Sequence, residues 1–245
     1  FVQDYPPLKA MEISIFHSIA AFNNSGFDIL GGLQNLIPYQ SDVLLNFVTC
    51  GLIIFGGLGF LVILDVLKMR SFKKLCLHSK VVITTSGILL ITGTLLLKVT
   101  EDISWLGAFF QSVSARTAGF STYPIGEFSN AGLFILAMLM FIGASPGSTG
   151  GGIKTSTFFA LLVSVRSLMT KKHYGAFHRS IPAEGISKAY MIAFLSLLVV
   201  CGGTLLLCIL EPGYSFIQLM FEVTSAFGTV GLSTGITPEL GNFSK

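Results

Sequence analysis

Long apolar runs alternate along the chain with shorter, half-polar segments. A bilayer crossing takes about 20 apolar residues. The runs of at least about that length cover 43–67, 81–99, 132–165 and 189–210, the third being interrupted by a glycine-rich stretch. The half-polar segments are 16–27, 110–120 and 221–232. Each begins with Phe, passes through small residues and ends in Gly followed by Phe or Leu, which predicts three copies of one unit.

Composition places the chain in a membrane. Hydrophobic residues make up 52% of it and charged residues 11%, against about 25% charged residues in soluble domains. The mean hydropathy is +0.77. We therefore predict an all-α integral membrane protein.

Ten of the fifteen Lys and Arg fall in two groups that join apolar runs. They are Lys68, Arg70, Lys73, Lys74 and Lys80, then Arg166, Lys171, Lys172, Arg179 and Lys188. The positive-inside rule makes both groups cytoplasmic loops. Glu101, Asp102, Glu127 and Glu211 then fall outside. Because topology explains the basic groups, we expect no nucleic-acid partner.

Residues that could carry catalysis or bind a metal are few. The four cysteines have no CxxC spacing and no His companions, so we expect no disulfide and no metal site. His78, His173 and His178 fall in the cytoplasmic loops, and Asp65 is expected to pair with the adjacent basic group. We predict that the chain is not an enzyme and holds no cofactor.

The stretch 143–157, GASPGSTGGGIKTST, carries five glycines. It resembles a nucleotide-binding loop only superficially, because Ile153 separates Gly152 from Lys154 and both flanks are membrane helix. Such a stretch cannot hold a regular helix against lipid, although it can line a water-filled path.

The half-polar segments have two readings. One such segment alone is an ordinary outer loop in which glycine ends a helix. Three copies in register favour short helices that enter the membrane and return as extended backbone. The carbonyls of that backbone replace the hydration shell of a cation, as in potassium filters.

These motifs carry a family resemblance. AFNNSGFD, SARTAGFS and SAFGTVGLSTG resemble the pore loops of the Trk/Ktr/HKT superfamily of potassium transporters, and GASPGSTGGGIK resembles the broken pore-lining helix of its bacterial members. The match is closest to the Ktr membrane subunits and covers essentially the whole chain. It implies repeated helix–pore loop–helix units around a central pore.

The resemblance assigns parts of the chain to repeats. We expect 1–70 to be the pore loop and second helix of repeat two, and 71–170 to be repeat three with its broken helix. We expect 171–245 to be the first helix and pore loop of repeat four. The family has four repeats, so the chain is expected to be a fragment that does not conduct alone.

The resemblance implies a selectivity filter. Its expected residues are Asn23, Asn24, Ser25 and Gly26, then Thr117, Ala118 and Gly119, and finally Gly228, Thr229, Val230 and Gly231. One glycine in each loop suggests fewer stacked carbonyl sites than a TVGYG filter has. Discrimination of potassium from sodium is then expected to be looser.

The resemblance also implies an intramembrane gating loop that obstructs the path. Its expected residues are Gly143, Ala144, Ser145, Pro146, Gly147, Ser148, Thr149, Gly150, Gly151, Gly152 and Lys154. Lys154 either binds loose carbonyls or a carboxylate, or extends to the cytoplasmic surface. The equivalent stretch 55–60, FGGLGF, favours close helix packing.

Charged and polar residues near the filter need separate roles. We interpret Arg116 as a brace behind the filter with a carboxylate partner, proposed to be Glu222 at the start of the fourth pore helix. The alternative is that both are solvated in the outer vestibule. His17 matches Gln111 and Glu222 in the repeats and is interpreted as a polar cap at a pore-helix start.

The predicted function is inward movement of potassium down its electrochemical gradient. The resemblance implies a multi-pass protein of a bacterial plasma membrane, surrounded by lipid bilayer. It further implies a homodimer with a cytoplasmic nucleotide-binding regulatory ring at the basic loops, and dependence on sodium. The alternative is a secondary transporter with a midplane site at the broken helix. That alternative leaves three outer loops running in the same sense unexplained.

Overall fold

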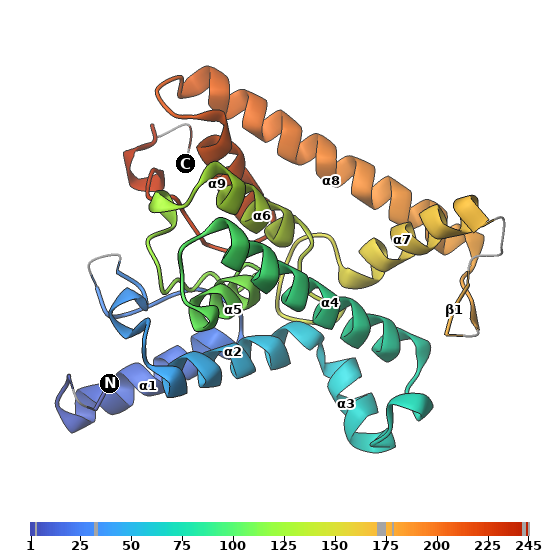
Figure 1. The fold of residues 1–245 in the computed structure, drawn as a ribbon, viewed down its shortest axis with the longest axis horizontal. Coiled ribbons are helices and arrows are strands. Elements are labelled where there is room, and N and C mark those ends of the chain that lie inside the picture. Colours follow the sequence, from blue (N-terminus) through green and yellow to red (C-terminus); the bar gives the residue numbers. More distant parts are fainter. Residues whose placement is uncertain (3, 32–33, 171–174, 178, 242–243, 245) are drawn as a thin grey trace.

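Helices make up nearly all of the regular structure in the computed structural model, which describes residues 1–2, 4–31, 34–170, 175–177, 179–241 and 244 (Figure 1). The α-helices are α1 (Pro7–Phe22), α2 (Val43–Leu58), α3 (Phe60–Met69), α4 (Leu77–Thr100), α5 (Trp105–Ser114), α6 (Asn130–Phe141), α7 (Thr155–Thr170), α8 (Ala183–Leu210) and α9 (Phe216–Phe227). Short 3₁₀ turns are η1 (Ile37–Tyr39), η2 (Phe72–Lys74), η3 (Ile125–Glu127) and η4 (Thr237–Glu239). Strands β1 (Gly175–Ala176) and β2 (Arg179–Ser180) form a small antiparallel hairpin. The fold class is thus the all-α membrane class that composition predicts.

Two helices are long and apolar enough to cross a membrane by themselves. These are α4 with 24 residues and α8 with 28 residues, and they match the runs 81–99 and 189–210. Side chains along α8 are apolar and exposed, including Phe194, Leu198 and Leu205. In a membrane protein this surface faces lipid. The run 132–165 is interrupted as predicted, because α6 ends at Phe141 and α7 begins at Thr155.

The run 43–67 is not the continuous span that its hydropathy predicts. It is two helices, α2 and α3, which are bent by 97° at Gly59. Gly59 has φ 84° and ψ 145°, a backbone conformation that residues other than glycine rarely adopt. The prediction of close packing fits Gly56, whose added Cβ would lie 1.9 Å from Phe22 O. It misses the break.

Two of the short helices begin at polar caps. Ser104 Oγ accepts from Gly107 N at 3.0 Å at the start of α5. At the start of α9, Ser215 and Gln218 form a reciprocal capping box. These caps satisfy amides that would otherwise lack partners at the helix start. The helix α1 begins instead with Pro6 and Pro7 and has no side-chain cap.

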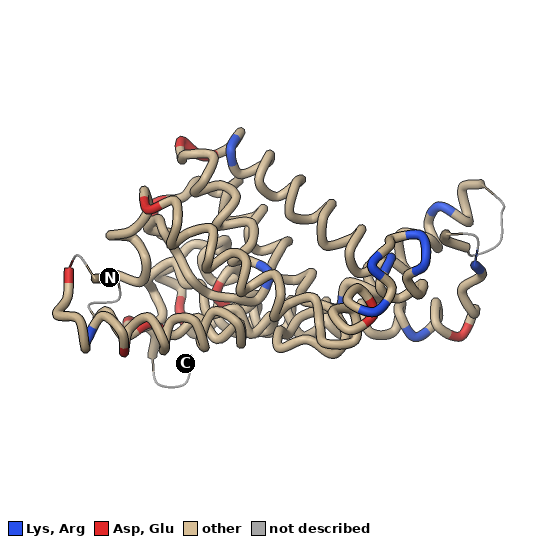
Figure 2. Tube along the Cα trace, turned by 90° about the horizontal axis from the view of Figure 1, so that it is seen from below, with Lys and Arg blue, Asp and Glu red and all other residues tan. Residues whose placement is uncertain are grey.

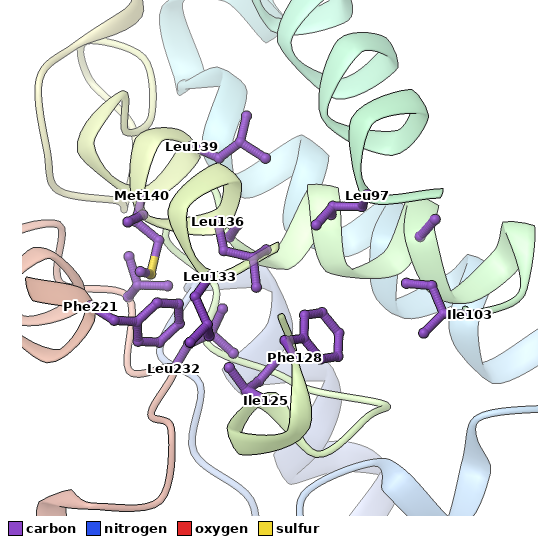
Figure 3. Close-up of a cluster of buried hydrophobic side chains, with 14 residues drawn as sticks. Leu97, Ile103, Ile125, Phe128, Leu133, Leu136, Leu139, Met140, Phe221 and Leu232 are labelled. Carbon is purple, nitrogen blue, oxygen red and sulfur yellow. The ribbon is translucent and has the colours of Figure 1, made fainter. Parts of the chain in front are cut away.

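A buried apolar cluster joins α4, α6 and α9 (Figure 3). Leu136 and Met140 of α6 are fully buried, and so are Leu97 of α4 and Phe221 of α9. A second cluster, which includes Ala21 of α1, Ile53 of α2 and Phe110 of α5, joins those three helices. The helices α1, α5 and α9 are therefore packed against their neighbours through buried apolar side chains.

Charges are segregated along the molecule. Figure 2 shows most Lys and Arg gathered at one end, the end that holds α3, η2 and the β1–β2 hairpin in Figure 1. The C-terminal ends of α4 and α8, followed by Glu101 and Glu211, point to the other end. This agrees with the orientation expected from the sequence. Lys171 and Lys172 lie outside the described residues.

Candidate functional site

The loops that follow α1, α5 and α9 share one backbone conformation. Each has a non-glycine residue at positive φ two positions before a glycine that is also at positive φ. The pairs are Asn24 (52°) with Gly26 (68°), Thr117 (76°) with Gly119 (80°), and Thr229 (52°) with Gly231 (91°). Asn tolerates this conformation, whereas the β-branched Thr117 and Thr229 are strained in it. The repetition of the left-handed conformation in three places supports the internal repeat more strongly than the sequence match does.

The glycines of the three loops meet. A Cβ added to Gly119 would lie 2.1 Å from Val230 O and 3.1 Å from Gly26 Cα. A Cβ on Gly26 would lie 2.8 Å from Ala118 O. Backbones from three separated parts of the chain approach each other here so closely that only glycine fits at Gly119.

Several carbonyls in these loops have no hydrogen-bond donor among the described residues. They belong to Asn24, Ser25, Thr117, Ala118, Thr229 and Val230. Most buried backbone carbonyls are paired, so a group of free ones implies water or an ion. The carbonyl-rich helix C-termini of α1, α5 and α9 add partial negative charge at the same place. The arrangement is suited to a dehydrated cation.

The glycine-rich break lies directly against these loops. A Cβ on Gly150 would lie 1.9 Å from Thr117 Oγ1, and one on Gly151 would lie 2.4 Å from Thr229 Oγ1. In the last turn of α2, just before the break at Gly59, a Cβ on Gly57 would lie 3.4 Å from Asn24 Nδ2. The non-glycine residue at positive φ in each of the three loops therefore lies beside a glycine of the 143–152 stretch or of the end of α2.

Backbone hydrogen bonds tie the two breaks together. Ser145 N donates to Gly57 O at 3.1 Å, and Phe60 N donates to Gly147 O at 3.3 Å. Within the loop, Ala144 N donates to Gly151 O at 3.2 Å. The loop is thus an ordered turn fixed to the α2–α3 junction. The stretch 55–60 acts in this site as its support, a role that the sequence reading missed although its three glycines signalled it.

Lys154 takes the first of its two predicted roles. Its ammonium donates to Gly150 O, and its side chain is half-buried. The charge therefore binds a carbonyl of the loop itself.

Arg116, in the loop after α5, is buried but lacks the predicted carboxylate partner. Its Nη2 donates to Gly143 O at 3.2 Å, and its Nε has no partner in the described part of the chain. The one ion pair found among described residues joins Lys188 to Glu184. The expected pair with Glu222 is therefore wrong. Arg116 instead connects the loop after α5 to Gly143, the first residue of the glycine-rich stretch.

Glu222 lies inside α9 and not at its start. Its Oε1 accepts from Thr234 N and Thr234 Oγ1, both at 2.8 Å, and from Ser233 Oγ at 3.0 Å. Its Oε2 accepts from Thr237 Oγ1 at 2.7 Å. The carboxylate is nearly fully buried, so it is not solvated in a vestibule either. It fastens segment 233–237, which follows the loop after α9.

His17 is likewise in a helix interior, since α1 begins ten residues earlier at Pro7. Its Nε2 forms a hydrogen bond with Thr49 Oγ1 at 2.8 Å. The matching Gln111 donates from Nε2 to Ser121 Oγ at 3.0 Å. The interpretation of His17 as a helix-start cap is therefore wrong. The three equivalent side chains are internal braces of the short helices.

Other predicted residues lie away from this site. Asp65 accepts from Cys76 N at 2.9 Å, at the start of α4, and forms no ion pair with the basic residues that the structure describes. All four cysteines are free. In the ranges described, no group of three or more His, Cys, Asp or Glu could hold a metal ion. His173 and His178 fall outside those ranges.

Comparison with known proteins gives one consistent family. The model of the TrkH family, described as cation transport protein, matches residues 12–245. The Ktr system potassium uptake protein B of Vibrio alginolyticus is 40% identical over 250 residues, which cover 96% of this chain and 54% of that protein. The potassium/sodium uptake protein NtpJ of Enterococcus hirae is 38% identical over 260 residues, which cover all of this chain and 57% of that protein.

A solved structure has the same fold. The potassium transporter TrkH from Vibrio parahaemolyticus superposes with a TM-score of 0.71 at 20% identity, over 90% of this chain and 50% of that one. The chain thus spans little more than half the length of the curated relatives it matches.

Proposed function

Because this chain belongs to the TrkH family of cation transport proteins, we propose that it forms much of the wall of a potassium pore. The family is one of transporters and not of enzymes. The filter consists of the backbone at Gly26, Gly119 and Gly231, and the break 143–154 is the gating loop beneath it. The pore takes potassium into the cell across the plasma membrane of a bacterium.

One observation carries this proposal. Three loops with the same left-handed backbone conformation meet at their glycines and leave carbonyls without donors among the described residues. Carbonyl oxygens replace the hydration shell of a cation without adding net charge, which suits a weakly hydrated monovalent ion that must also leave. Three loops related in the same sense favour this pore over a transporter with inverted repeats.

The gating role rests on the position of the break. Gly150 and Gly151 touch the strained threonines of two filter loops, so an ion that leaves the filter meets this loop next. Its fixation to the α2–α3 junction describes a closed state. A cytoplasmic nucleotide-binding ring, a homodimeric assembly and a role for sodium are further parts of the proposal. The name of the potassium/sodium relative supports the last of these.

Growth of uptake-deficient bacteria at low potassium tests the function. Cells carrying the complete gene are expected to grow, and cells carrying Gly119→Ser are not, at equal amounts of protein in the membrane, because a Cβ at Gly119 would lie 2.1 Å from Val230 O. Gly87→Ala is the matched control, because nothing lies within 4 Å of a Cβ at Gly87. Growth that Gly119→Ser leaves unchanged would remove these loops from the ion path.

A further inference from the structure

A groove at the basic end of the molecule combines apolar walls with positive charge. It measures about 410 Å³ and lies between the end of α3, η2 and the start of α4. Its apolar walls are Val66, Leu67, Phe72, Leu75 and Ile83, and Arg70 is also among the lining residues.

The helix that leads into this groove has the character of an interfacial helix. Because α3 is bent by 97° from α2, the two helices cannot both follow the membrane normal. Phe60, Leu64 and Leu67 form one stripe along α3 and are 60%, 58% and 65% exposed. On the opposite face Val62 is fully buried and Asp65 binds Cys76 N. An exposed apolar stripe that ends in basic residues fits a helix at the inner membrane surface.

The basic residues at the groove are available for a ligand. Lys68, Arg70, Lys73 and Lys74 are exposed, and none forms an ion pair within the described ranges. Figure 2 shows basic positions gathered at this end of the molecule. Asp65 accepts a hydrogen bond from the Cys76 amide and interacts electrostatically with Lys68. Because four basic residues face this one acidic residue, the surface carries net positive charge beside an apolar groove.

We propose that this groove binds an anionic phospholipid of the inner leaflet. The acyl chain lies along Leu67, Phe72 and Ile83, and Arg70 with Lys73 holds the phosphate. Basic pockets on the cytoplasmic side of membrane helices attract anionic headgroups, and a guanidinium matches phosphate geometry with paired donors. The proposed regulatory ring would contact the charged loops from the cytoplasm, whereas an apolar groove that continues the exposed apolar stripe of α3 fits a lipid acyl chain.

The consequence for the protein is mechanical. The end of α3 forms one wall of the groove. At the start of α3, Phe60 N donates to Gly147 O and so ties this helix to the proposed gating loop. A lipid that holds α3 against α4 would therefore stabilise the junction to which the gating loop is tied. The binding itself does not depend on the proposed ion path.

Native mass spectrometry of the purified full-length protein tests the proposal. Phosphatidylglycerol and phosphatidylcholine of the same chain length are titrated separately. Wild type is expected to retain phosphatidylglycerol preferentially. Arg70→Gln with Lys73→Gln should weaken retention by roughly 25-fold, about fivefold for each charge. Arg166→Gln with Lys188→Gln removes two charges elsewhere and is expected to change little.

A second variant tests the apolar part. Ile83→Trp fills the groove without changing charge and should also reduce retention of phosphatidylglycerol. Equal retention of both lipids by wild type would overturn the proposal, as would equal losses in the groove variant and the Arg166/Lys188 control. If Ile83→Trp retained phosphatidylglycerol as well as wild type does, the proposal would also be overturned. The headgroup would then be held by charge alone, without an acyl chain in the groove, and the site would be one for any anion.

Discussion

Thr117 and Gly150 are in contact although Thr117 belongs to the loop after α5 and Gly150 to the break between α6 and α7. A Cβ on Gly150 would lie 1.9 Å from Thr117 Oγ1 and 2.8 Å from Thr117 Cβ. Thr117 is itself held at a φ of 76°. The glycine is therefore required by its neighbour, since its own φ is not in the left-handed region.

Gly150→Ala should displace the gating loop from beneath the filter. The loop is held by hydrogen bonds of ordinary strength, each worth about 1 kcal/mol, whereas the filter loop is packed in the core. The loop is thus the part that gives way, and the initial rate of rubidium uptake should rise several-fold at constant protein.

Gly87→Ala is again the control for this measurement, because its added methyl meets open space and alanine favours a helix. An unchanged rate in Gly150→Ala, with normal amounts in the membrane, would show that the loop does not limit uptake.

The filter glycines should differ in sensitivity. Gly119→Ala places Cβ 2.1 Å from Val230 O at a φ of 80°, whereas at Gly231 the nearest atom is 4.0 Å away and φ is 91°. Gly231→Ala therefore adds only the left-handed strain of about 1–2 kcal/mol. Gly119→Ala adds a steric clash between backbones.

Potassium uptake rates of the two alanine variants test this order. We expect Gly119→Ala to lose at least about tenfold relative to wild type and Gly231→Ala to lose less. If Gly231→Ala lost more uptake than Gly119→Ala, the close contact between Gly119 and Val230 O would not determine the shape of the proposed ion path.

The sequence predicts the helices and the three loops well because both depend on local patterns. Apolar runs mark α4 and α8, and the stretch 143–152 predicts the break between α6 and α7. The break at Gly59 was missed because FGGLGF is apolar, and glycine in a membrane helix serves packing and bending equally. Only the contact of Gly59 with the Pro146–Gly147 backbone decides between them.

The partners of the buried charges could not be predicted, because they depend on three-dimensional placement. The rule that a buried charge is paired led to Arg116 with Glu222. In the fold, Arg116 binds the carbonyl of Gly143, 27 residues downstream, and Glu222 accepts from hydroxyls 11–15 residues downstream. Spacing along the chain contains neither relationship.

Glu222→Gln should destabilise the protein. The carboxylate accepts four hydrogen bonds in a buried place, and an amide keeps one acceptor oxygen and brings two donors where donors already converge. We expect a loss of about 1.5–3 kcal/mol, measured as a lower melting temperature in detergent. Glu239→Gln is the control, since exposed Glu239 accepts from Tyr214 OH, and it should change stability by less than about 0.5 kcal/mol. Equal effects would contradict the fastening role of Glu222.

Arg116 and Glu222 should behave as independent sites. Melting-temperature shifts of Arg116→Gln, Glu222→Gln and the double variant form a thermodynamic cycle. Residues without shared partners add within about 0.5 kcal/mol, whereas a buried ion pair would give a much larger coupling. We expect additivity here. Glu222→Gln with Thr234→Ala is the positive control, because Thr234 Oγ1 donates to Glu222 Oε1 at 2.8 Å and that cycle should not be additive. Strong coupling between Arg116 and Glu222 would mean that the two charges meet in the membrane. Glu222, and not Gly143 O, would then be the main partner of the guanidinium.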